Sequence, residues 1–95
     1  MKVYWTDRAV NDLHAIHDYI ARTSPEYAQR MVDRLTRRSE QIGVFPYSGR
    51  AVPEFEIEPV REVLESSYRI IYGIRADRVD VLAVIHGSRQ ILLDE

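Results

Sequence analysis

The chain has 95 residues, of which 45% are hydrophobic and 29% are charged, and its formal net charge is −2. This composition is typical of one small globular domain, residues 1–95, and it carries no positive excess for binding nucleic acid phosphates. It has no cysteine, which excludes disulfides and cysteine-ligated zinc. No apolar run is long enough for a signal peptide or a membrane span. We therefore expect a cytoplasmic protein with no cofactor and no membrane contact.

The first predicted elements are a strand and a helix. Residues 2–5 (KVYW) are typical of a short strand. Thr6 is a suitable N-cap, and Asp7 suits the positively polarised first turn of a helix. The residues that follow predict a helix of about four turns with one apolar stripe. That stripe is formed by Ala9, Leu13, Ile16 and Ile20.

A second helix is predicted to start at Ser24, which suits an N-cap and is followed by Pro25 and Glu26. Gly43 is expected to end it. The short connection at residues 22–24 makes the two helices an antiparallel hairpin. The apolar stripe of this helix is Ala28, Met31 or Val32, Leu35 and Ile42. A row of arginines is expected on its solvated face: Arg30, Arg34, Arg37 and Arg38.

Turn-forming residues at 45–54 (FPYSGRAVPE) predict a loop, and three strands follow at 60–65, 68–75 and 79–86. The last two form a hairpin. The acidic stretch from Glu54 to Glu65 is interpreted as a solvated edge strand. The fold class is therefore α+β: a two-layer β-α-α-β-β-β domain with the helical hairpin packed on one face of a mostly antiparallel sheet.

Alternation along the last two strands predicts which side chains share a face. Tyr68, Ile70, Tyr72 and Ile74 should face the helices, together with Val79, Val81, Ala83 and Ile85. If Arg75 lies opposite Arg78, then Arg69 lies opposite Val84, and Arg69 and His86 share the open face of the sheet. Gly73 would leave that face shallow, and Arg89 would reach its rim. The direction of Arg61 stays open, because VREVLE alternates poorly.

The first helix also carries two histidines at a spacing that can bind a metal ion. His14 and His17 lie three residues apart, with Asp18 beside them. Two histidines at this spacing on a helix surface usually bind no metal ion, and we expect no metal site. The chain also has no glycine-rich phosphate loop and no nucleophile elbow.

Six short segments together resemble the RelE/ParE superfamily of bacterial toxin–antitoxin toxins. They are AVNDLHAIHDYIA (9–21), SPEYA (24–28), FPYSGR (45–50), VRE (60–62), SYRIIY (67–72) and VIHGSR (84–89). Their order and the predicted fold match that family along nearly the whole chain. The resemblance implies a helical hairpin on one sheet face and a cognate antitoxin that wraps over the toxin. It implies one of two activities, inhibition of DNA gyrase or cleavage of messenger RNA on the ribosome.

The gyrase branch is the closer match. A nuclease needs a proton acceptor, a proton donor and phosphate ligands. His86, Arg69 and Arg61 are the candidates for those roles, but no second proton-transfer residue follows His86. Lys2 is the one lysine, so a lysine-rich ribosome-binding surface is absent. The residues expected to bind target or antitoxin are Arg50, Arg61, Arg69, His86 and Arg89. A non-toxic module that only binds the antitoxin is a further alternative.

Overall fold

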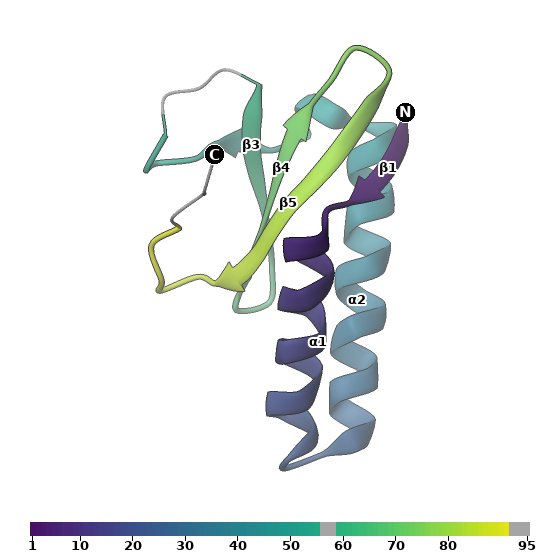
Figure 1. Cartoon of the computed structure of the whole chain (residues 1–95), viewed down its shortest axis with the longest axis vertical. Helices are drawn as coiled ribbons and strands as arrows, with labels where there is room; N and C mark the ends of the chain where they lie inside the picture. The colour runs from purple at the N-terminus through teal and green to yellow at the C-terminus, as the bar shows by residue number, and fades with distance from the viewer. Residues whose placement is uncertain (56–58, 92–95) are drawn as a thin grey trace.

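In a computed structural model, which describes residues 1–55 and 59–91, two helices pack against one face of a sheet (Figure 1). The helices are α1 (Asp7–Ala21) and α2 (Pro25–Val44), followed by a short 3-10 helix, η1 (Pro46–Ser48). The strands are β1 (Lys2–Trp5), β2 (Arg50–Ala51), β3 (Val60–Glu65), β4 (Tyr68–Ile74) and β5 (Arg78–His86). They form a sheet in the order β1-β5-β4-β3-β2. β1 is parallel to β5, and the other neighbouring pairs are antiparallel.

The caps that the sequence predicted are confirmed. The hydroxyl of Thr6 accepts a hydrogen bond from the Ala9 amide, and that of Ser24 accepts one from the Tyr27 amide. The predicted helix end at Gly43 is wrong, since α2 continues to Val44. Gly43 is required for packing, because a Cβ there would lie 2.7 Å from the Met1 carbonyl oxygen. Among the described residues, no helix is both long and apolar enough to cross a membrane.

The main core lies between the helices and the sheet. The predicted stripes supply its helical side, where Ala9, Met31, Leu35 and Ile42 are buried. The sheet contributes Val63, Ile70, Tyr72, Val79, Val81 and Val84. The predicted helix-facing set of β4 is therefore confirmed.

The opposite face of the sheet is covered by the chain's own loops. Val52 and Ile91 are buried there against Ile71 and Ala83, and Phe55 packs beside them. β2, which the sequence analysis treated as loop, holds the start of this covering segment against β3. The expected open face is thus a second, smaller apolar cluster.

A β-bulge between β4 and β5 changes which residues share a face. From Ile74 to Tyr72 the partners in β5 are Val79 to Val81, as predicted, but Ile71 pairs with Ala83. Leu82 is the extra residue, and an extra residue reverses the alternation beyond it. Val84 and His86 therefore lie on the helix side, whereas Ala83 and Ile85 lie on the other side. The predicted placement of these four residues is wrong.

Candidate functional site

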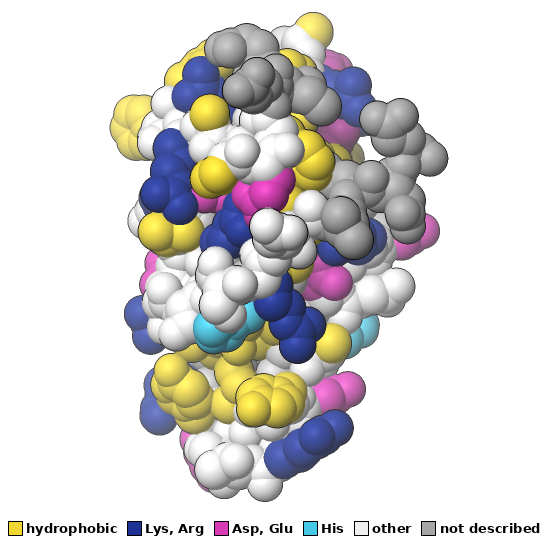
Figure 2. Space-filling model, turned by 90° about the vertical axis from the view of Figure 1, so that its left-hand side faces the viewer, with side chains coloured by type: hydrophobic (Ala, Val, Ile, Leu, Met, Phe, Trp, Pro, Cys, Tyr) yellow, Lys and Arg dark blue, Asp and Glu magenta, His cyan; other side chains and the backbone are white. Residues whose placement is uncertain are grey.

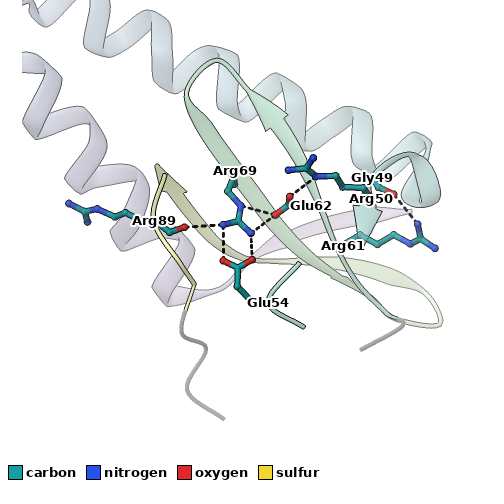
Figure 3. A network of polar contacts seen from close by, with 7 residues as sticks. All are labelled: Gly49, Arg50, Glu54, Arg61, Glu62, Arg69 and Arg89. Atoms are coloured by element: carbon teal, nitrogen blue, oxygen red, sulfur yellow. Dashed lines mark hydrogen bonds and ion pairs between the residues drawn. The ribbon is translucent and has the colours of Figure 1, made fainter. Parts of the chain in front are cut away.

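Arg69 stands at the centre of a buried polar network on the sheet face opposite the helices (Figure 3). Its side chain is on β4, and the residue is 5% exposed. Nε donates to Glu62 at 2.7 Å. The two terminal nitrogens donate to the two carboxylate oxygens of Glu54 at 2.9 and 2.7 Å. Nη1 also donates to the carbonyl oxygen of Arg89 at 2.9 Å.

Both carboxylates are tightly bound to arginine. Glu62 is fully buried, and its second oxygen accepts a 2.7 Å bond from Arg50. The hydrogen bonds from Arg69 lower the pKa of Glu54 to about 2, against an opposing effect of burial. The same bonds raise the pKa of Arg69. Charge-assisted, bidentate bonds of this kind are among the strongest in proteins. The Arg69 guanidinium is therefore occupied by hydrogen bonds within its own chain.

The network joins three segments that are distant in sequence. Glu54 also accepts a hydrogen bond of 3.1 Å from the backbone amide of Ile91. Arg69 thereby holds the loop that contains Glu54, the strand that contains Glu62 and the C-terminal segment from Arg89 to Ile91. The loop and the C-terminal segment supply Val52, Phe55 and Ile91, whose side chains cover this face of the sheet. The arrangement stabilises that cover.

His86 does not join Arg69. It pairs with Tyr68 in the sheet, and its ring meets the Tyr68 ring edge-on at 5.8 Å on the helix side. Its Nδ1 lies 2.7 Å from the Ser88 hydroxyl and accepts a bond from the Ser88 amide. Arg69 instead lies opposite Ile85 on the other face. The prediction that Arg69 and His86 share one face is wrong because of the bulge at Leu82.

Arg61 also points away from Arg69. It pairs with Tyr72, which faces the helices, and donates a 2.9 Å bond to the Gly49 carbonyl. Its guanidinium lies 5.2 Å from the centre of the Tyr47 ring. The structure thus gives the direction that VREVLE left open, and the predicted cluster is divided between the two sides of the sheet.

Arg50 and Arg89 border a shallow groove of about 630 Å³ between the β3–β4 turn and residues 87–90. Leu64, Ser66, Tyr68 and Gln90 also line it. The side chain of Arg89 extends away from Arg69, so only its backbone belongs to the network (Figure 3). Figure 2 shows basic, acidic and histidine side chains above an apolar area on this side of the molecule. The groove therefore has a mixed border in which arginine is already partly neutralised.

The sequence analysis missed Glu54, Glu62 and Tyr72 as organising residues. The acidic stretch was interpreted as solvated, yet Glu62 is buried and Glu65 pairs with Arg34 at 3.0 Å. Residues 56–58 of that stretch lie outside the described residues. One available signal was Glu62 in mid-strand beside Val63, because a charged residue that becomes buried needs a partner. That partner is Arg69, the second residue of β4, just after the β3–β4 turn.

Comparison with known proteins gives the family of this chain. Residues 3–91 match the family model described as "ParE toxin of type II toxin-antitoxin system, parDE". The chain belongs to this ParE toxin family. The chain is similar to Toxin RelE2 of Caulobacter vibrioides. The two are 36% identical over 89 residues, which cover 93% of this chain and 97% of the relative.

Solved structures share the fold of this ParE family toxin. One is the chromosomal ParDE toxin–antitoxin system of P. aeruginosa, with a TM-score of 0.73 and 22% identity over 90% of this chain and 95% of that one. Another is the toxin–antitoxin complex RelBE2 of Mycobacterium tuberculosis, with a TM-score of 0.65, 20% identity and the same coverage of both chains. The predicted α+β fold and the predicted superfamily are confirmed.

Proposed function

We propose that this toxin arrests growth from the cytoplasm by binding DNA gyrase, and that a cognate antitoxin neutralises it. Membership of the ParE family supports the proposal, as does the likeness of the fold to a ParDE system. A binding inhibitor stabilises one state of its target and needs no proton-transfer residues of its own. Inhibition by binding requires only a toxin surface that is complementary to gyrase.

The separation of the three nuclease candidates is the observation that carries this proposal. RNA cleavage requires groups for proton transfer and phosphate binding to meet at one phosphodiester. Arg69 is occupied by Glu54 and Glu62 on one face of the sheet. His86 and Arg61 pair with Tyr68 and Tyr72, which are four residues apart on β4, or about 13 Å along the strand. Such an arrangement favours binding over cleavage.

Ribosome-dependent cleavage of messenger RNA is the second candidate function. The name of the Caulobacter relative, Toxin RelE2, favours it. So does the exposed position of His86, whose ring nitrogen is held by Ser88 at the end of the groove that Arg89 borders. In that case His86 would be the first candidate for proton transfer, because a positioned imidazole can accept and donate a proton.

The free end of the helical hairpin is a suitable surface for the antitoxin. Tyr19 and Tyr27 are exposed there, beside half-buried Ile20. Arg22 and Arg30 lie over the two tyrosine rings at 5.9 and 5.8 Å. An amphipathic helix with an acidic border would complement both the apolar surface and the cations.

Expression of the toxin without its partner in bacteria tests the proposed target. We expect growth arrest in which incorporation of thymidine stops first and cells become filamentous. Rapid loss of methionine incorporation before any effect on DNA synthesis would support messenger RNA cleavage instead. Normal growth would support the third alternative, a module that binds an antitoxin and is not toxic.

A further inference from the structure

The segment that joins α2 to β2 presents three large apolar side chains to solvent. We call residues 44–49 (VFPYSG) the aromatic loop. Val44, Phe45 and Tyr47 are 69%, 66% and 68% exposed. Scattered exposed apolar residues are ordinary, but three in one short segment form a patch, and apolar patches mark interaction sites. The sequence analysis treated this segment only as a turn beside Arg50.

Hydrogen bonds from the core residue Tyr72 fix the backbone of the aromatic loop. The Tyr72 hydroxyl, in the core, donates to the Pro46 carbonyl at 2.7 Å and accepts from the Gly49 amide at 3.0 Å. The Phe45 amide continues the bonding of α2 by donating to Gln41 at 2.9 Å. Gly49 is required for this close contact, because a Cβ there would collide with the Tyr72 hydroxyl and lie 2.6 Å from the Glu62 carbonyl oxygen. Phe45 and Tyr47 are therefore displayed on a fixed backbone.

Two arginines lie beside the loop. Arg61 stacks on the Tyr47 ring and bonds to the Gly49 carbonyl. Arg38 lies less than two turns before the end of α2 and donates to the Gln41 side chain at 3.1 Å. Exposed aromatic rings next to arginine have the composition of binding hot spots. A rigid loop also loses little conformational freedom when it binds.

We propose that the aromatic loop is a docking site for a protein partner that has apolar pockets for Phe45 and Tyr47 with a carboxylate beside them. The identification of that partner as gyrase rests on the proposed function. A second copy of the chain fits less well. A twofold interface through this patch would bring Arg38 and Arg61 of both copies together, and like charges across an interface oppose binding. The charge of the patch therefore favours an acidic partner of another kind.

A double substitution, Phe45→Ser with Tyr47→Ser, tests the proposal. Both side chains are exposed, so the fold should be retained, which circular dichroism and thermal unfolding will check. We expect binding of purified gyrase to the immobilised toxin to weaken about tenfold or more, with a parallel loss of supercoiling inhibition. The matched control is Tyr4→Ser. Tyr4 is 48% exposed and lies under Arg78, on β1 at the sheet edge opposite to β2, the strand into which the aromatic loop leads. We expect the control to change binding less than twofold.

Equal binding by the double variant and the wild type would overturn the docking site. If wild-type toxin does not bind gyrase at all, the proposed function fails. Growth inhibition then decides about the loop, since the docking site predicts that the folded double variant is harmless whereas Tyr4→Ser is toxic. Binding to a fluorescent DNA duplex is the last control. A loss there equal to the loss of toxicity would assign the loop to nucleic acid and contradict a protein partner.

Discussion

Arg69 and Tyr72 lie three residues apart on β4, point to opposite faces of the sheet, and each holds a loop. Arg69 binds two carboxylates and the Arg89 carbonyl, and it buries almost all of its charge. Tyr72 uses one neutral hydroxyl to hold Pro46 and Gly49, and the loop above it displays its aromatic residues. The difference teaches that a charged residue typical of a functional site can be structural. A segment rich in turn formers can instead be the better candidate for binding.

Replacing Arg69 should have the largest effect. Arg69→Met leaves Glu54 without its arginine and Glu62 with only Arg50, and breaking a buried ion pair costs about 3–5 kcal/mol. The control is Arg75→Met, because Arg75 pairs with Asp80 but its side chain is 65% exposed, where such pairs contribute about 0–1 kcal/mol. Urea unfolding measures both. Equal losses for the two variants would show that the network does not stabilise the fold.

Acid should weaken the same network by a slightly smaller amount. The pKa of Glu54 is about 2 in the folded chain and 4.5 in its ordinary state. Its stabilising effect is therefore complete above about pH 5 and is lost as the pH falls toward 2, with a total of about 3 kcal/mol. The free energy of unfolding measured from pH 6 to pH 2 should fall less steeply in Glu54→Gln. Identical slopes for the variant and the wild type would contradict this assignment.

Removing the Tyr72 hydroxyl should have the smallest of these effects on stability. Tyr72→Phe leaves the Gly49 amide and the Pro46 carbonyl without their partner, at about 1–3 kcal/mol. Hydrogen exchange of the Gly49 amide should become faster, while Tyr4→Phe, an exposed control, should change neither quantity. Unchanged exchange at Gly49 would mean that the loop is fixed by other contacts.

Local rules were sufficient for most of the fold. Thr6 and Ser24 cap the helices as their side chains predict, and the apolar stripes and the β4 alternation identified the core. The bulge at Leu82 escaped prediction because one extra residue leaves an apolar strand looking regular in sequence. β2 escaped because it has only two residues.

The candidate site was less predictable than the fold. Alternation placed Arg69 on the face opposite the helices, and this is confirmed. Strand alternation could not predict that Glu54 and Ile91 lie over that face, because neither residue belongs to a strand. The position of His86 depended on the β4–β5 register, and that of Arg61 on the side of β3 to which its side chain points. Only the tertiary structure gives both. Their roles in binding stay predictions.

Supercoiling of relaxed plasmid by purified gyrase, with increasing amounts of this toxin, tests the central claim most directly. A binding inhibitor of gyrase predicts loss of supercoiled product and accumulation of cleaved DNA after protein denaturation. Arg75→Met toxin should act like the wild type in the same assay. Undisturbed supercoiling at a large molar excess of toxin, together with cleavage of messenger RNA on purified ribosomes, would contradict it.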